Sequence, residues 1–280
     1  MVELGNKMRE SMISTIFSGG TASVIQITST YWLRTNIKYQ YRHGTSPIES
    51  LKKLILDKDK FRLYRGFIPT LIKGSIGKTG EVVSYTYFKK YTDINDNLKI
   101  VGASITSSIL RFNLMPFDNV TNIYQVHGKN GLDILKKKYK NNGFKIFYTG
   151  TAVYFLNNFI GNMIWFSVFD IMNSLLFLNG VYKERNNERN KYKDEYKDIK
   201  NLCIGFTCSA TTDLITNPLR VIKTYRQSDE NNISYNRAIK NILREKGLKN
   251  YLVRGLTSRI LLGGLNSAIF VFLWKRIEEN

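Results

Sequence analysis

The chain of 280 residues has little cysteine, histidine or proline and few acidic residues for its number of basic ones. Its two cysteines give no disulfide framework, and its two histidines, far from them in sequence, give no metal-ligand spacing. With so little histidine, no Ser-His-Asp or Cys-His constellation is supported, and we expect no enzyme, no cofactor and no metal site. The charged opening MVELGNKMRE also predicts no cleavable signal peptide.

Long hydrophobic runs are also missing. Mean hydropathy is −0.25, and no purely apolar run of about 18 residues occurs, which at first sight argues against a membrane protein. Six segments are nevertheless long enough to span a bilayer, and each mixes apolar with Ser, Thr, Asn, Gln and occasional charged residues at helical spacing. They are residues 11–40, 67–91, 98–125, 151–178, 200–227 and 256–277. We therefore predict an all-α membrane protein with six amphipathic transmembrane helices.

Basic residues are abundant: Lys and Arg number 42 against 22 Asp and Glu, a formal charge of +20. Such an excess favours anionic partners, namely nucleic acid, anionic lipid or an anionic metabolite. The basic residues gather on three connections that flank apolar helices, so membrane lipid is a simpler partner than nucleic acid. By the positive-inside rule these three connections face one compartment and both chain ends face the other.

A motif near the end of one spanning segment recurs three times. Its copies are YWLRTNIKYQ (31–40), PFDNVTNIYQ (116–125) and PLRVIKTYRQ (218–227), and each leads through a basic amphipathic stretch to a closing glycine: Gly66, Gly150 or Gly255. Self-similarity at a long period decides the architecture. It divides the chain into repeats at 1–95, 96–182 and 201–280, with residues 183–200 predicted as a charged, solvated loop.

The repeated motif, followed by LYRG (63–66), FYTG (147–150) and LVRG (252–255), resembles the mitochondrial carrier family over essentially the whole chain. The resemblance implies a three-fold pseudosymmetric barrel of six helices in the mitochondrial inner membrane, with short helices in the matrix. It further implies a monomer, cardiolipin as a lipid partner, and transport of a small molecule by alternating access through a central site gated at both ends.

The resemblance also assigns the gates, which depart from the family pattern. On the matrix side an acid of one repeat pairs with a base of the next, and the matching positions are Leu33 and Asn36, Asp118 and Thr121, Arg220 and Lys223. Only Asp118 with Lys223 is retained as a pair. On the opposite side the corresponding charged positions are Lys89, Asp170, Lys275 and Glu278, with the charge order of the third copy reversed.

Equivalent positions in the three repeats predict the central site. The first candidates for substrate contact are Lys73, Arg111, Asn157 and Asn158, and the second group is Gln26, Glu81, Asp213 and Asn266. Each has a structural alternative, because a helix Asn often bonds a neighbouring helix and Arg111 with Asp213 could be a buried ion pair. Charged groups inside a membrane are costly and tend to be functional.

Lys73 and Arg111 favour an anionic group on the substrate, since arginine grips carboxylate or phosphate with two parallel hydrogen bonds. A carboxylate or nucleotide-like metabolite is therefore the first prediction. An amino-acid-like zwitterion, answered by Glu81 or Asp213, is the second. The eroded matrix gate leaves open a third reading, a carrier-fold protein that serves as a non-transporting membrane adaptor.

One segment, GSIGKT (74–79), is similar to a phosphate-binding loop. That motif requires a further glycine where this chain has Ile72, and it requires a preceding strand. The repeat alignment instead places the segment inside a spanning helix, so we predict no nucleotide hydrolysis there.

Overall fold

The computed structural model describes residues 24–184 and 191–278, which form helices joined by short turns, with no strand in these two ranges. The predicted all-α fold is confirmed. In chain order the α-helices are residues 24–43, α2 (Pro47–Ile55), α3 (Phe67–Tyr91), α4 (Asp96–Asn113), α5 (Met115–His127), α6 (Gly131–Asn142), α7 (Thr151–Glu184), α8 (Lys191–Ser228), α9 (Tyr235–Val253) and α10 (Leu256–Glu278).

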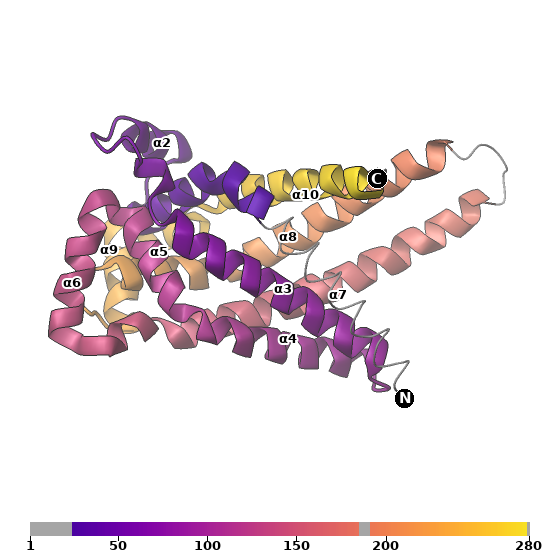
Figure 1. Ribbon diagram of the computed structural model, residues 1–280, viewed down its shortest axis with the longest axis horizontal. Helices are drawn as coiled ribbons and strands as arrows, with labels where there is room; N and C mark the ends of the chain where they lie inside the picture. The colour runs from indigo at the N-terminus through magenta and orange to yellow at the C-terminus, as the bar shows by residue number, and fades with distance from the viewer. Residues whose placement is uncertain (1–23, 185–190, 279–280) are drawn as a thin grey trace.

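The long helices lie lengthwise in one bundle, and the short helices collect at one end of it (Figure 1). Helix α3 packs on α4, α4 on α7, α7 on α8, and α8 on α10. Helices α2, α6 and α9 occupy the same end, which we call the connection end. The turn between α3 and α4 lies at the opposite end. All three basic connections therefore share one side of the molecule, as the sequence predicts.

Burial in the bundle differs from that in a water-soluble protein, because many apolar side chains are exposed and many polar ones are buried. Ile68, Ile72 and Ile76 form an exposed apolar stripe along α3, because residues four apart lie on one helix face. In contrast, the buried face of α4 includes three serines, Ser104, Ser107 and Ser108, beside Ile100 and Ala103. An apolar outside around a polar inside is the pattern of a bundle that faces lipid. Judged by length and composition alone, one stretch of the described chain, Met115–Leu175, qualifies as a candidate span.

The three closing glycines have the same backbone conformation. The φ angles of Gly66, Gly150 and Gly255 are 78°, 89° and 70°, in the left-handed region that side chains with a Cβ avoid. Each glycine immediately precedes a long helix, α3, α7 or α10. Glycine therefore recurs at this position because the turn needs a left-handed φ, which residues with a Cβ rarely adopt.

The repeat is also visible in two backbone carbonyls, those one and three residues before each closing glycine. In the second and third copies one asparagine of the preceding long helix donates to both carbonyls, and in the first copy two side chains donate to one carbonyl each. The bonds are Tyr31 to Arg65 O (2.8 Å), Thr35 to Leu63 O (2.7 Å), Asn119 to Phe147 O (2.7 Å) and Thr149 O (3.1 Å), and Asn217 to Leu252 O (2.8 Å) and Arg254 O (3.1 Å). Tyr31, which replaces the motif proline in the first copy, is thereby used as a hydrogen-bond donor.

Two predictions of helix extent need correction. The segment predicted as one helix over 98–125 is broken at Leu114, between α4 and α5. Because Pro116 lacks an N–H and its ring crowds the preceding turn, the chain tightens there, and the Leu114 amide donates to Arg111 O at 3.1 Å. The equivalent Pro218 lies inside a continuous α8.

The predicted loop over 183–200 is also wrong in part, because α7 continues to Glu184 and α8 begins at Lys191. Lysine, glutamate and arginine are good helix formers, and extending an existing helix costs far less than nucleating one. Residues 185–190 lie outside the described part of the chain.

Candidate functional site

Three carboxylates lie inside the bundle, Glu81 on α3, Asp118 on α5 and Asp213 on α8. Asp118 and Asp213 are each approached by two basic side chains from the interior. Glu81 is approached by Arg111 at 2.6 Å and by the half-exposed Lys78 of its own helix at 3.7 Å. A buried ion needs partners to offset the loss of water around it, and in these clusters the basic side chains are those partners. Two bases for each acid leave the interior positive.

Asp118 joins three helices toward the connection end. Its Oδ1 accepts from Lys73 Nζ of α3 at 2.8 Å, and its Oδ2 accepts from Lys223 Nζ of α8 at 3.0 Å. Gln227 Nε2 donates to the same Oδ2 at 3.2 Å. The predicted pairing of Asp118 with Lys223 is confirmed. The structure adds that Lys73, predicted as a substrate contact, binds the same carboxylate as the predicted gate residue Lys223.

Asp213 is held by two arginines. Arg220 lies seven residues further along α8, and Arg259 Nε of α10 lies 3.1 Å from Asp213 Oδ1. Arg220, which occupies the acid position of the third gate motif, is therefore paired within its own helix. Its counterpart in that gate, Asn36, bonds α2 instead, through Pro47 O at 3.2 Å and the hydroxyl of Ser50.

Glu81 and Arg111 form the third cluster, with 2.6 Å between Arg111 Nη2 and Glu81 Oε1. The alternative pairing of Arg111 with Asp213 is wrong. Gly77 of α3 explains the geometry, because a Cβ there would lie 3.2 Å from Arg111 Nη1. The bare backbone of α3 lets the guanidinium of α4 settle against it, beside Glu81 one turn further on. The GSIGKT segment lies within α3, which confirms its predicted helical setting.

The predicted amide contacts separate into different roles. Asn157 of α7 is buried, and its Oδ1 has no hydrogen-bond partner among the described residues. Asn158 turns back to its own helix, donating to Tyr154 O at 2.7 Å. Gln26 Nε2 donates to Asn266 O of α10 at 3.1 Å, so this pair joins the first and last long helices. Of these amides, Asn157 alone combines burial with an oxygen left unused in the described bundle.

At the opposite end, one cross-helix ion pair is found among the described residues. Lys89 Nζ of α3 lies 2.8 Å from Asp170 Oδ1 of α7, and the Tyr85 hydroxyl donates to the same oxygen at 2.8 Å. The Tyr85 ring stacks on Phe166 at a centroid distance of 4.5 Å. The structure thus brings Lys89 and Asp170 together. The side chains of Lys275 and Glu278 lie outside the described residues.

Two interior cations were missed in the sequence. Arg34 and Lys38 lie one turn apart on the first long helix, and their hydrogen bonds go to hydroxyls, Arg34 Nε to Thr30 at 3.2 Å and Lys38 Nζ to Thr224 at 3.2 Å. Among the described residues neither has a carboxylate within 4.0 Å. Their spacing of four residues was the available signal, since it places both on one helix face.

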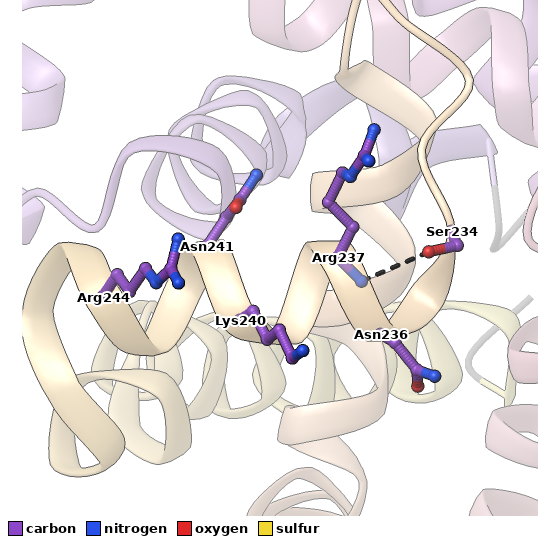
Figure 2. Close-up of a pocket in the computed structure, with 6 residues that line it drawn as sticks. All are labelled: Ser234, Asn236, Arg237, Lys240, Asn241 and Arg244. Carbon is purple, nitrogen blue, oxygen red and sulfur yellow. Dashed lines mark hydrogen bonds between the residues drawn. The ribbon is translucent and has the colours of Figure 1, made fainter.

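A separate basic surface lies on α9, away from these clusters. A shallow hollow there is lined by Ser234, Asn236, Arg237, Lys240, Asn241 and Arg244 (Figure 2). The Ser234 hydroxyl caps the helix by accepting from the Arg237 amide at 3.3 Å. Ala238 and Ile242 are buried on the other side of α9, so the basic face looks outward. It is suited to an anionic surface rather than to an enclosed ligand.

Comparison with known proteins adds two findings. The family model described as "Mitochondrial carrier protein" matches three successive parts of the chain, residues 8–95, 98–180 and 194–279. The chain is also 24% identical over 280 positions to "Mitochondrial substrate carrier family protein J" of Dictyostelium discoideum, an alignment that covers 87% of this chain and 81% of that protein. The three matched parts correspond to the three structural repeats.

Proposed function

Because the chain belongs to the mitochondrial carrier family, whose members transport solutes across mitochondrial membranes, we propose that it carries a small anionic metabolite across the inner membrane. The substrate is a carboxylate or a nucleotide-like compound, moved by alternating access. The observation that carries this proposal is the charge of the interior, where Asp118 and Asp213 are each shared by two bases and Arg34 and Lys38 are hydrogen-bonded to hydroxyls.

The Asp118 cluster suggests how substrate and gate are connected. Lys73 is bound to the same carboxylate as Lys223, at 2.8 and 3.0 Å. An anionic group that enters the centre competes with Asp118 for Lys73. Since a ligand shifts a conformational equilibrium only through different contacts in the two states, this competition supplies the coupling that alternating access needs. Arg111 offers the substrate a second contact for an anionic group. The Oδ1 of Asn157, which has no partner in the described part of the chain, offers it a hydrogen-bond acceptor.

In this proposal the connection end faces the matrix and the chain acts as a multi-pass monomer. The basic face of α9 then lies at the membrane surface, where Arg237, Lys240 and Arg244 contact the phosphates of an anionic lipid such as cardiolipin. Binding of this kind weakens as salt rises, because exposed charges are screened.

Uptake into proteoliposomes tests the proposal. The purified protein is reconstituted with cardiolipin and offered labelled dicarboxylates, tricarboxylates, nucleotides and amino acids one at a time. We expect uptake of an anion, lost in Lys73→Ala and in Arg111→Ala and kept in Lys90→Ala, which removes an exposed lysine from the same helix as Lys73. Uptake of amino acids alone would favour the zwitterion. That alternative has less support, because Glu81 and Asp213 are already occupied by bases.

A non-transporting adaptor is the second candidate. It is favoured by Leu33, which replaces a gate acid and is buried in an apolar cluster with Val221, Ile222 and Tyr225 of α8. Apolar packing there holds the first helix to α8 without a charge that could be exchanged. A folded, lipid-binding protein that takes up none of the solutes would support this candidate and refute transport.

A further inference from the structure

The last carbonyls of a helix have no partner within the helix and must be satisfied from outside. At the connection end three long helices finish in this way: residues 24–43, α5 and α8. In each case a buried cation from a different repeat binds the free carbonyls. Cations are also favoured at this position because the C-terminal end of a helix carries partial negative charge.

The first repeat binds the second through Arg62, which is 4% exposed. Its Nη1 donates to Gln125 O at 2.9 Å and its Nη2 to Val126 O at 2.6 Å, both in the last turn of α5. Gly128, the residue after α5, has a φ of 61° and lies against the Arg62 side chain. The end of α5 is thus shaped around an arginine that belongs to the first repeat.

The second repeat binds the third through Lys138 of α6, which is 2% exposed. Its Nζ donates to Gln227 O at 2.9 Å and to Asp229 O at 2.8 Å. The carbonyl between them, Ser228 O, lies 2.6 Å from the ring nitrogen Nε2 of His127, also from the second repeat. Three successive carbonyls at the end of α8 are therefore bound from one neighbour.

The third repeat binds the first through Arg254, which is 2% exposed. Its Nη1 lies 3.3 Å from Tyr41 O and 3.4 Å from Arg42 O, and Lys246 Nζ donates to Gly44 O at 2.9 Å. The contacts therefore run from repeat one to two, from two to three, and from three back to one. Together they close a ring around the connection end.

The three cations do not occupy equivalent sequence positions. Arg62 lies four residues before its closing glycine, Lys138 twelve before and Arg254 one before. Three unrelated positions have thus come to serve equivalent helix ends, which argues that the contact matters more than the motif. Across each boundary these three cations bind main-chain oxygens, whereas the acids that Arg62 and Arg254 also contact, Asp57 and Glu245, belong to their own repeats. The contacts between repeats therefore do not depend on the acids that the gate motif has lost at Leu33 and Arg220.

We propose that Arg62, Lys138 and Arg254 are positioning residues that hold the connection end closed by tying each repeat to the next. The ring supplies closure at all three boundaries between repeats, whereas the acid-base pair of the gate motif is kept at one. The inference rests on the proposed function only in that the connection end must also be able to open.

Distances between spin labels test the ring without a substrate. Cysteines replace the exposed residues Leu56 of the first repeat, Leu132 of the second and Leu248 of the third, two at a time, in a background where Cys203 and Cys208 are serine. Pulsed electron paramagnetic resonance in lipid nanodiscs then measures each boundary. Loss of a charge-assisted hydrogen bond changes an equilibrium by about tenfold or more, so we expect the open, longer-distance population to rise by about that factor.

Each variant should act first at its own boundary. Lys138→Met widens the distance from Leu132 to Leu248, and Arg62→Met widens that from Leu56 to Leu132. Lys138→Arg keeps a donor and should restore the short distance, while Lys136→Met removes an exposed lysine of the same helix and should leave it unchanged. Unchanged distances in Lys138→Met and Arg62→Met, with only a lower unfolding temperature, would overturn the proposal and leave a purely structural role.

A matched pair of glycines gives a second test that leaves the cations in place. Gly128 and Gly143 both have a φ of 61°, so alanine strains the backbone at either position. A Cβ on Gly128 would lie 2.8 Å from Arg62 Cδ, whereas a Cβ on Gly143 would meet nothing within 4 Å. We expect Gly128→Ala, but not Gly143→Ala, to widen the distance from Leu56 to Leu132. Equal effects would contradict the ring. Failure of uptake has no bearing on either measurement.

Discussion

Lys73 on α3 and Lys223 on α8 bind the two different oxygens of one carboxylate, that of Asp118, at 2.8 and 3.0 Å. Helices from all three repeats therefore meet at a single side chain, α3 from the first, α5 from the second and α8 from the third. An acid in this position sets the separation of three helices at once.

Asp118→Asn should accordingly destabilise the whole protein. Removing one partner of a buried ion pair costs about 3–5 kcal/mol, because the remaining charges stay buried without compensation. We expect a lower unfolding temperature in detergent and slower uptake of the transported anion. Asp133→Asn, the same change at an exposed position of α6, is the control. Equal unfolding temperatures for the two variants would show that the cluster contributes nothing to stability.

Double-mutant cycles should distinguish the real partner of Arg111 from the one that the sequence suggested. Contacting residues show interaction energies of about 0.5–3 kcal/mol, and separate ones add to within about 0.5 kcal/mol. We expect coupling between Arg111→Met and Glu81→Gln, and additivity between Arg111→Met and Asp213→Asn. The measurement is unfolding free energy in a detergent where unfolding is reversible. Coupling to Asp213 instead would mean that Arg111 has a different neighbour from the one observed.

At the opposite end, Tyr85→Phe removes one hydroxyl and keeps the stacked ring. The lost hydrogen bond to Asp170 should cost about 0.5–1.5 kcal/mol of unfolding free energy. Tyr87→Phe, two residues along the same helix at an exposed position, should change it by less than about 0.5 kcal/mol. A cost for Tyr87→Phe as large as that for Tyr85→Phe would point to the aromatic rings rather than to the Asp170 contact.

Lys138 should make stability depend on alkaline pH. Burial lowers the pKa of its ammonium from 10.5 to about 8 in the folded protein. Between these values the unfolded chain binds more protons than the folded one, so the free energy of unfolding rises with pH from about 8 and levels off above about 10.5. Lys138→Met lacks this contribution, and its stability relative to the parent should fall over the same interval. Thermal unfolding at pH 7.5, 9 and 10.5 checks the sign, with Lys136→Met expected to follow the parent.

The features that sequence predicts best are those that backbone geometry forces. Helix α3 was predicted at its observed bounds, because Gly66 supplies a left-handed turn before it and polar residues follow it. The pair Asp118 with Lys223 could be predicted because both belong to one repeated motif. In these cases the position of a residue in one repeat predicts the role of the equivalent residue in the others.

Contacts between non-equivalent positions could not be predicted in this way. The sequence offers a pair of Arg111 with Asp213 only as an alternative to substrate contact, whereas the actual partner of Arg111 depends on which helix leaves space for it, and Gly77 provides that space on α3. Arg62 and Lys138 occupy no motif position, and only the packed structure shows that they meet helix ends of the next repeat. The length of α8 was underestimated because charge alone does not end a helix.

The carbonyls before the closing glycines show which structural feature the three repeats have in common. The donors to these carbonyls are Tyr31 and Thr35 in the first repeat, Asn119 in the second and Asn217 in the third. They stand at different positions relative to the repeated motif. One copy can therefore exchange its donor for another without disturbing the other two. Internal duplication can drift far in residue identity while its scaffold stays constant, and the ancestry of such a chain is preserved more faithfully by its turns than by its polar side chains.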